Sequence, residues 1–195
     1  MRTHKIEHAP MVRLGDLIEL CDERNESGKY TLDDVRGIST EKKFIETKAN
    51  LDGVSLTSYK IVMPDEFVYV ADTSRRGEKI ALALNDTNSG FLISSIYTTF
   101  RSKDENILLP EYLYLLLSRT EFDRYSRFNS WGSARETFDW SEMCRVQIPV
   151  PPLEIQQKIV NLFNCYEECK RISTTAREKI KNLCPALVQK AAHSN

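Results

Sequence analysis

The hydrophobic positions in the last third of the chain recur at alternating steps of four and three residues. A mean step of 3.5 places them on one narrow stripe of a helix, which is typical of a helix that packs against a second, similar helix. Except for the polar Ser173, the stripe consists of Ile155, Ile159, Leu162, Tyr166, Cys169, Ala176, Ile180, Leu183 and Leu187, and we call these nine residues the seam. The chain has no second copy of this pattern. The pattern therefore predicts a long C-terminal helix that dimerises through the seam.

The segment before this helix is apolar and rich in proline. Residues 148–153 read Ile-Pro-Val-Pro-Pro-Leu, a stiff stretch that leads directly into the helical pattern. We therefore expect a globular domain over residues 1–150, and a hinge with the long helix over residues 151–195. Pro185 interrupts the pattern near its end, and we expect the helix to kink or fray there.

The pattern before residue 105 is that of short β-strands. Residues 11–20 read as the end of a strand followed by a helical turn. The segments after them are rich in β-branched and aromatic residues and are separated by turn-forming residues. They cover residues 60–63, 67–71, 79–84, 91–95 and 97–100. This spacing predicts a twisted, mostly antiparallel sheet.

A helix is expected to begin at Pro110, because proline suits the first helical position. Its broad apolar face consists of Tyr112, Leu113, Leu115, Leu116 and Phe122. A final strand is expected over residues 145–150. The sequence thus predicts an α+β fold in which a sheet and short helices are followed by one long coiled-coil helix.

Size and composition fit this organisation. The chain has 195 residues, which is room for one domain and an appendage, and its 41% hydrophobic and 28% charged residues are typical of a soluble globular protein. The longest strongly apolar run, residues 112–117, is too short to span a bilayer. We therefore expect a cytoplasmic protein that makes no membrane contact.

The five cysteines are expected to be reduced. Three of them, Cys165, Cys169 and Cys184, lie in the predicted helix and read as small apolar residues. The three histidines lie at positions 4, 8 and 193, far from the cysteines in sequence. We therefore expect no metal site.

Motifs of catalysis are absent from the sequence. No two glycines have the GxG spacing of a phosphate-binding loop. The only Pro-Pro pair, residues 151–152, is followed by leucine and not by the aromatic residue that an amino-methyltransferase needs. Histidine, the usual base for a Ser or Cys nucleophile, occurs only near the ends. We therefore expect a chain that is not an enzyme and carries no cofactor.

Arginines and aromatic residues alternate between residues 119 and 140. An arginine can bind guanine or clamp a phosphate, and an exposed aromatic ring can stack on bases. This combination is typical of proteins that read DNA, and the candidate DNA-binding residues of the stretch are Arg127, Trp131 and Arg135.

A structural interpretation of the same stretch is also open. Three aromatic residues have helical spacing and are expected in the core: Phe122, Tyr125 and Phe128. Arg119 and Arg124 can pair with Glu121 or Asp123 on a solvated face. Packing explains Trp131 and Arg135 least well, because they flank Gly132 in a polar loop.

Two further segments are candidates for DNA contact. The turn over residues 73–79 carries Arg75, Arg76 and Lys79, which can follow a phosphate backbone or simply form a solvated hairpin. Near residue 95, Ser95 and Tyr97 carry hydroxyls that can donate to bases or phosphates, or satisfy the edge of the sheet.

Several of these segments together resemble a known family. The hinge Ile-Pro-Val-Pro-Pro-Leu, followed by Gln156-Gln157-Lys158-Ile159, is the most specific of them. Gly132-Ser133-Ala134-Arg135 and residues 95–100 add weaker support. From about residue 12 to its end, the chain resembles the specificity subunit of type I restriction-modification systems, in a half-length form with a single target recognition domain.

The resemblance implies both a function and partners. Members of this family typically hold two recognition domains and two long helices that pack antiparallel, whereas this sequence supplies one of each. It implies double-stranded DNA as a ligand, methyltransferase subunits that carry S-adenosylmethionine as partners, and possibly a restriction subunit. Two copies, or this chain and another half-subunit, would pair through the helix.

The sequence therefore predicts a non-catalytic subunit that directs methyltransferase and restriction subunits to a bipartite DNA site. A second hypothesis keeps the fold without DNA reading: an interaction or decoy module that binds modification subunits through its helix. A third, an autonomous nuclease, has no motif in its favour.

Overall fold

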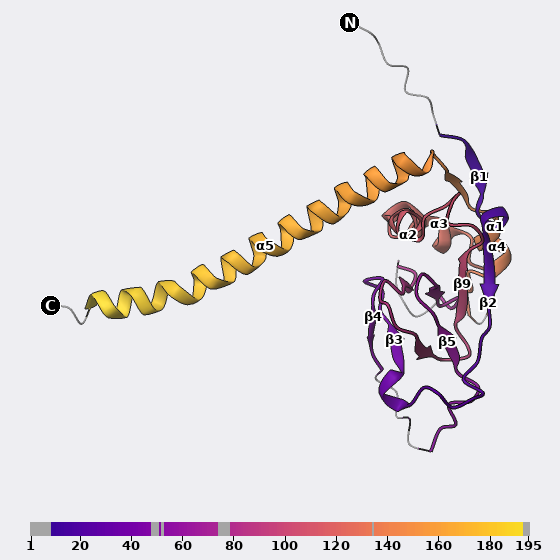
Figure 1. The fold of residues 1–195 in the computed structure, drawn as a ribbon, viewed down its shortest axis with the longest axis horizontal. Coiled ribbons are helices and arrows are strands. Elements are labelled where there is room, and N and C mark those ends of the chain that lie inside the picture. The colour runs from indigo at the N-terminus through magenta and orange to yellow at the C-terminus, as the bar shows by residue number, and fades with distance from the viewer. Residues whose placement is uncertain (1–8, 48–50, 52, 74–78, 134, 193–195) are drawn as a thin grey trace, which may run out of the picture. The chain divides into compact units, whose positions relative to one another are not determined.

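The protein is described by a computed structural model that covers residues 9–47, 51, 53–73, 79–133 and 135–192, with backbone only from residue 182 onward. The chain divides into two units, residues 1–156 and 157–195, which are described separately below. Figure 1 shows the order of the elements along the chain.

Ten short strands and a few helices make up the described part of the first unit. The strands are β1 (Met11–Arg13), β2 (Ile18–Cys21), β3 (Arg36–Ile38), β4 (Phe44–Glu46), β5 (Lys60–Val62), β6 (Phe67–Tyr69), β7 (Leu82–Leu84), β8 (Phe91–Ile93), β9 (Thr98–Ser102) and β10 (Gln147–Pro149). The helices are α1 (Leu14–Leu17), the 3-10 helix η1 (Leu32–Asp34), α2 (Pro110–Leu117), α3 (Thr120–Phe128) and α4 (Trp140–Arg145). The helix α5 (Leu153–Ala192) begins in this unit and continues through the second.

Every pairing between these strands is antiparallel, and they form four separate sheets. The largest has the order β2-β9-β6-β7, and β1-β10, β3-β4 and β5-β8 are two-stranded. The α+β fold class is confirmed, with four antiparallel sheets in place of one. The termini of the first unit meet in one of them, since Val12 pairs with Ile148.

The core lies around the neighbouring strands β6 and β7 of the largest sheet. All residues of β6 and β7 are buried, because other elements cover both faces of these strands. The rings of Phe67 and Phe100 stack with centroids 4.8 Å apart, and Tyr69 meets Phe100 edge to face at 6.1 Å. A continuous apolar run, not an alternating one, is therefore the signature of these strands.

The helix predicted at Pro110 is confirmed, but its extension to Phe122 is wrong. The helix α2 ends at Leu117, and α3 begins at Thr120 after Arg119, whose backbone is extended at φ −74° and ψ 150°. Phe122 is buried from α3 and meets the ring of Phe138 edge to face at 6.0 Å. In Figure 1, α2 and α3 lie close together within the first unit.

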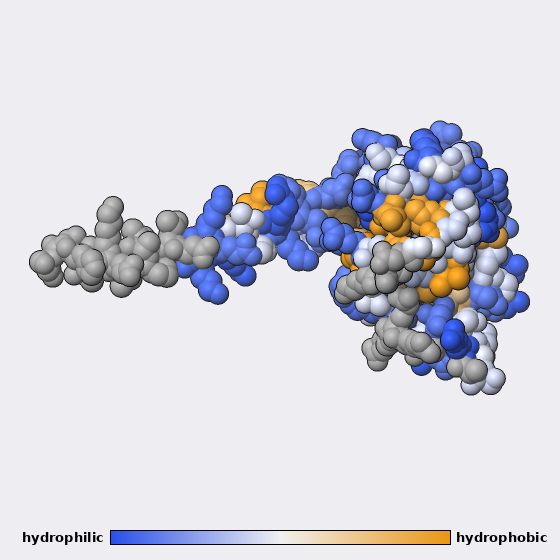
Figure 2. Space-filling view, turned by 90° about the horizontal axis from the view of Figure 1, so that it is seen from below, coloured by the Kyte–Doolittle hydropathy of each residue, from blue (hydrophilic) through white to orange (hydrophobic). Residues whose placement is uncertain are grey.

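In the second unit, α5 is a single helix that continues past Pro185 to Ala192. The expected fraying at Pro185 is therefore wrong, and the alternative, a kink there, stays a prediction. Figure 2 shows apolar and polar surface alternating along the described part of this helix. The side chains of Leu183 and Leu187 lie outside the described residues.

Candidate nucleic-acid interface

The topology of the largest sheet brings distant segments to one end of it. At this end β6 and β2 finish, at Tyr69 and Cys21, and β7 and β9 begin, at Leu82 and Thr98. We call it the loop end of the sheet. Tyr69 is paired with both Leu82 and Thr98, so the loops attached to these three strands are neighbours.

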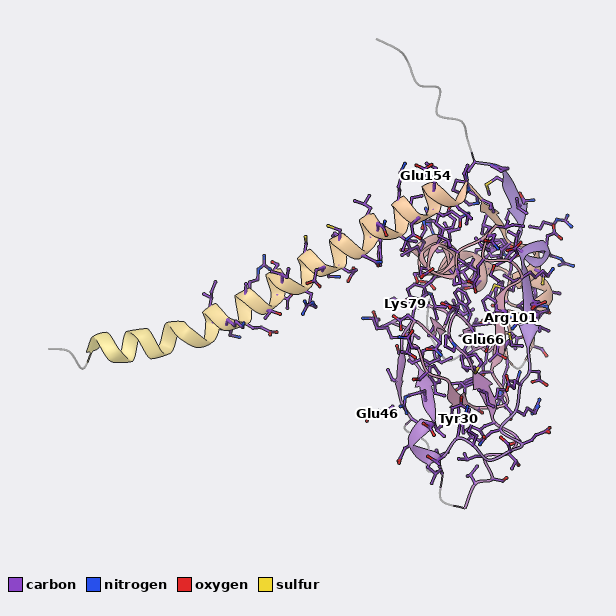
Figure 3. All side chains as sticks on the ribbon, in the orientation of Figure 1. Tyr30, Glu46, Glu66, Lys79, Arg101 and Glu154 are labelled. Atoms are coloured by element: carbon purple, nitrogen blue, oxygen red, sulfur yellow. The ribbon has the colours of Figure 1, made fainter. Side chains whose placement is uncertain are left out.

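The described ends of the basic turn, Thr73 and Lys79, lie near the loop end, because they follow β6 and precede β7. Arg75 and Arg76 lie outside the described residues. Lys79 is half exposed and points outward from the unit (Figure 3), where its Nζ lies 2.9 Å from Oε1 of Glu41. An exposed pair of this kind contributes little to stability, so Lys79 can exchange Glu41 for another anion.

Ser95 and Tyr97 also lie at the loop end, in the turn between β8 and β9. The turn is closed by the amide of Tyr97, which donates to the carbonyl of Ser94 at 3.1 Å. Tyr97 is partly buried against the cluster that contains Val68 and Val70. Ser95 is half-buried. Tyr97 therefore has a packing role, and contact of the Ser95 and Tyr97 hydroxyls with DNA or with the edge of the sheet stays a prediction.

The arginine and aromatic loop reaches the same place through backbone hydrogen bonds. The bridge between Trp131 and Thr137 closes it, with N to O distances of 3.1 and 2.9 Å. The loop is hydrogen-bonded to the segment that follows β6, because the amide of Thr73 donates to the carbonyl of Glu136 at 3.0 Å. The Thr73 hydroxyl also donates to the Ser130 hydroxyl at 2.9 Å. The structure thus brings described residues of the three candidate segments to the same end of the sheet.

Gly132 is required for the shape of this loop. Its φ of +140° is one that L-residues rarely adopt, and a Cβ at this position would lie 2.0 Å from the carbonyl oxygen of Arg135. The glycine therefore allows the chain to turn so that Trp131 and Arg135 lie on either side of it.

The three candidate residues of the loop differ in how free they are. Trp131 has 62% of its surface exposed, and Arg135 is exposed and forms no ion pair with a described residue. Arg127 forms an ion pair with Glu136, which holds the end of α3 against the loop. Arg135 is thus the arginine most available to a ligand. Arg127 would first have to break its ion pair with Glu136.

The expectation that Phe128 belongs to the core is wrong, because 79% of its surface is exposed. Positions three and six residues beyond Phe122 are rotated by about 60° and about 120° around the helix from it. Phe122 is therefore buried, Tyr125 is half-buried, and Phe128 has turned to the surface. The structural interpretation of Arg119 is supported by its ion pair with Glu121 at 3.3 Å.

Sequence reasoning missed a group of charged residues at the loop end. Asp22 follows β2, and its carboxylate lies 3.0 Å from the guanidinium of Arg24 and 3.2 Å from Nζ of Lys60. Hydrogen bonds from Lys60 and Arg24 hold the pKa of the Asp22 carboxyl below its usual value. No motif marks these residues: Arg24 is two residues from Asp22, and the isolated bridge between Arg24 and Lys60 brings Lys60 to them.

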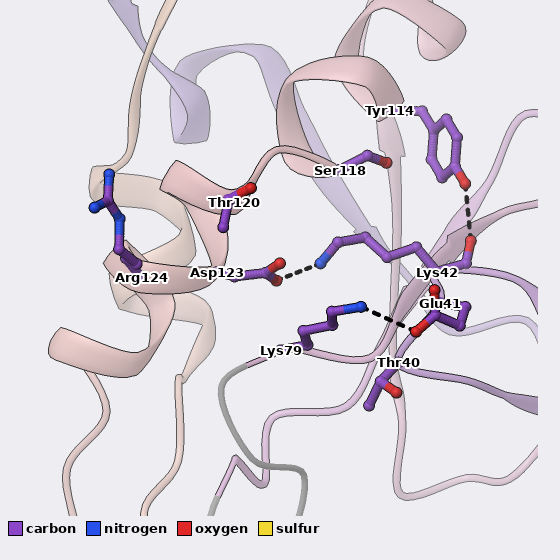
Figure 4. A pocket seen from close by; sticks show the side chains of 9 residues that line it. All are labelled: Thr40, Glu41, Lys42, Lys79, Tyr114, Ser118, Thr120, Asp123 and Arg124. Carbon is purple, nitrogen blue, oxygen red and sulfur yellow. Dashed lines mark hydrogen bonds and ion pairs between the residues drawn. The ribbon is translucent and has the colours of Figure 1, made fainter.

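A pocket of about 350 Å³ lies beside Lys79, between α3 and the turn that joins β3 to β4 (Figure 4). Across it, the ammonium of Lys42 lies 2.5 Å from the carboxylate of Asp123, and both side chains are buried. The same Asp123 oxygen accepts the amide of Ile80 at 3.2 Å. Burial lowers the pKa of Lys42, although Asp123 beside it acts in the opposite direction. This pair fastens the turn to α3 and to the start of β7.

Most of the seam is exposed on α5. The exposed fractions are 42% for Ile155, 39% for Ile159, 72% for Leu162, 59% for Tyr166 and 60% for Ile180, and Cys169 and Ala176 are exposed as well. Soluble proteins seldom leave such a row of apolar side chains in water without a partner for it.

The part of the chain that the structure describes supports neither a metal site nor a membrane-spanning helix. It contains no cluster of three or more His, Cys, Asp or Glu residues that could hold a metal ion. Nor does any helix within it combine the length and the apolar character needed to cross a bilayer.

Sequence comparison gives the family to which this fold belongs. Residues 7–182 match the family model described as type I restriction modification DNA specificity domain. The chain therefore belongs to the family of type I restriction-modification specificity domains. A comparison with curated proteins finds no match.

Solved structures share the fold. An HsdS subunit from Thermoanaerobacter tengcongensis is 24% identical, with a TM-score of 0.56, over 91% of this chain and 48% of that one. A type I restriction-modification S subunit from M. genitalium is 16% identical, with a TM-score of 0.53, over 86% and 41%. A chain from a structure on complex assembly and conformational transition of the type I R-M system is 17% identical, with a TM-score of 0.51, over 92% and 45%. This chain thus spans about half the length of the structures it resembles.

Proposed function

We propose that this chain is a non-catalytic recognition subunit that reads DNA sequence and directs separate methyltransferase and restriction subunits to a bipartite site. The observation that carries the proposal is the convergence of the candidate segments on the loop end of the sheet. Family membership supports the same role. S-adenosylmethionine would be bound by the methyltransferase partner and not by this chain.

The residues at the loop end fall into candidates for phosphate contact and candidates for base contact. Lys79 and Arg127 are held in weak surface pairs, so they can turn to phosphates and position the domain. Arg135 has no ion pair with a described residue and lies with Trp131 in a loop that Gly132 shapes, so these two are the candidates for contact with bases. Arg75 and Arg76 would add phosphate contacts from the neighbouring turn.

The seam is proposed as the contact with a second copy or with another half-subunit. Two helices related by a two-fold axis would bury their seams against each other and restore two recognition domains. From Ile155 to Ile180 the described seam is about 38 Å long at the helical rise, which is close to one turn of DNA. An identical partner would give an inverted repeat as the target.

The test begins with the target. Methylated sites are mapped in cells with and without the gene, and a duplex with the mapped site is used to measure the affinity of the assembled complex. If each side chain reads one base, replacing Arg135 or Trp131 with alanine should weaken binding to this duplex by about 1–3 kcal/mol, with little effect on a scrambled duplex.

The matched control is Arg145→Ala. Arg145 is an exposed arginine at the end of α4, next to Val146, whose carbonyl accepts the amide of Leu14, so it lies away from the loop end. This variant should bind the mapped site like the unchanged protein. If Arg135→Ala and Trp131→Ala leave both affinity and methylation pattern unchanged while the complex assembles, the domain does not read DNA through this loop, and the decoy module becomes the better account.

A further inference from the structure

Phe128 is an exposed aromatic residue for which the fold gives no reason. Its exposed fraction of 79% equals the highest value among the described large apolar residues. Burying a phenylalanine side chain stabilises a protein, and the exposed Phe128 contributes little of this to the fold. Contact with a ligand would account for its exposed position.

The end of α3 holds Phe128 in a rigid setting. The side-chain amide of the next residue, Asn129, donates to the carbonyl of Tyr125 at 2.9 Å. The hydroxyl of Ser130 donates to the carbonyl of Ser126 at 2.6 Å and accepts from Thr73. The last turn of α3 is therefore tied to the loop end, and Phe128 would give up little backbone freedom on meeting a ligand.

The surroundings of Phe128 favour DNA as that ligand. Trp131, three residues further on, is a second exposed aromatic residue, and Arg124, Arg127 and Arg135 flank the pair in sequence. The nearest carboxylate in the loop, Glu136, is already paired with Arg127. Aromatic rings between arginines suit a duplex, whose phosphates attract the guanidinium groups while the rings reach the bases.

We propose that Phe128 contacts base pairs of the bound duplex by wedging against one base step, which it partly unstacks. This inference rests on the proposed function, since it assumes that the loop end faces DNA. An inserted apolar side chain lets a protein recognise how easily a step deforms, so Phe128 would add specificity at a step that no hydrogen bond reads.

The experiment uses duplexes of the mapped site with the fluorescent base 2-aminopurine placed at successive positions, and the full chain assembled with its methyltransferase subunits. The unchanged protein should raise the fluorescence at one step. Phe128→Ala should abolish this rise and weaken binding at least tenfold, whereas Phe128→Trp should keep most of both. Because Phe128 is exposed, its replacement should leave the thermal unfolding midpoint unchanged.

Met11→Ala is the matched control, since Met11 is also exposed, at 57%, but lies in β1, away from the loop end. It should keep the fluorescence rise and the affinity. If Phe128→Ala binds and unstacks the duplex like the unchanged protein, Phe128 does not wedge against a base step. The proposed recognition function would be unaffected by this result. If Phe128→Ala instead loses its methyltransferase subunits and keeps DNA affinity, this face contacts protein, which also overturns the inference. If the unchanged complex binds no DNA, the proposed function and the wedge fail together.

Discussion

Lys42 occupies a backbone conformation that a lysine rarely adopts. Its φ is +59°, in the left-handed region, where a residue with a Cβ is less stable than glycine by about 1–2 kcal/mol. The turn is closed by the amide of Lys42, which donates to the carbonyl of Ser39 at 3.1 Å. The reason for a lysine at this position is its ammonium group, which forms an ion pair with the buried carboxylate of Asp123.

Replacing Lys42 with glycine therefore has two opposing effects. The backbone relaxes by about 1 kcal/mol, and the loss of the buried pair leaves Asp123 without its cation, which costs about 3 kcal/mol. We expect a net loss of about 2 kcal/mol in the free energy of unfolding, measured with urea. The control is Asp65→Gly, at φ +64° without a described ion pair, which should be neutral or stabilising. Equal effects in both variants would mean that the Lys42 pair contributes nothing.

Asp139 stabilises the start of α4. Its carboxylate accepts the amide of Glu142 at 2.9 Å and the hydroxyl of Ser141 at 2.8 Å, and these hydrogen bonds lower its pKa. A pKa that is lower in the folded state gives stability that is present above the unfolded-state value, about 3.9, and is lost as the pH falls through the folded-state value.

Asp139→Ala should therefore lower the free energy of unfolding by about 1 kcal/mol at pH 7, and the difference from the unchanged protein should shrink below about pH 4. Asp139→Asn keeps an acceptor for the helix amides, so it should lie within a few tenths of a kcal/mol of the unchanged protein at neutral pH. Urea unfolding at pH 7 and at pH 3 checks both. A difference for Asp139→Ala that grows in acid would contradict this role.

At the scale of elements, the side chain of Gln156 ties the first turn of α5 to the rest of the first unit. Gln156 is fully buried, and its Oε1 accepts the amide of Leu109 at 3.0 Å. Its Nε2 donates to the carbonyls of Ile107 and Pro151, both at 2.8 Å. Three backbone groups of the unit thus depend on one amide, which connects the hinge before α5 to the loop before α2.

Gln156→Leu keeps the size of the side chain and removes all three hydrogen bonds. We expect a loss of about 3 kcal/mol in the free energy of unfolding, because buried backbone groups are left without partners. The neighbouring Gln157→Leu is the control, since Gln157 is exposed and donates to Asn161 within the helix. Thermal unfolding of the two variants compares them directly, and similar midpoints would show that the buried amide is dispensable.

The elements that the sequence predicts well are those with a strong local signal. Pro110 starts α2, and the spacing of the apolar residues from Ile155 onward predicts α5. Short elements were missed where the signal is local and weak: β3 and β4 have three residues each, and α4 has six. The division into four sheets could not be predicted, because which strands pair is decided by contacts between residues distant in sequence.

At the scale of the whole molecule, the candidate site is a product of topology. Residues 73, 95 and 131 lie in different parts of the sequence, and their chemistry alone does not say that they meet. They meet because β6 ends where β7 and β9 begin, and because Thr73 binds Glu136 and Ser130. For the same reason Lys60 was missed as a partner of Asp22, since only its bridge with Arg24 brings it there.

The seam makes the most direct prediction about assembly. Leu162 is 72% exposed in a single chain, and burying it in a partner helix would contribute about 2 kcal/mol per copy. A charge at this position would have to be buried in the interface, so Leu162→Glu should shift the protein from dimer to monomer in sedimentation velocity experiments. DNA binding should then weaken as well, because the two recognition domains no longer act together.

Ile172→Glu provides the matched control on the same helix. Ile172 is 56% exposed and is not a seam residue, so a glutamate there should leave the dimer intact. Dissociation by both substitutions would mean that the contact surface is not the predicted stripe. If the unchanged chain sediments as a monomer both alone and with the methyltransferase subunit, α5 does not join two copies, and pairing with a different half-subunit or with none must replace the symmetric arrangement.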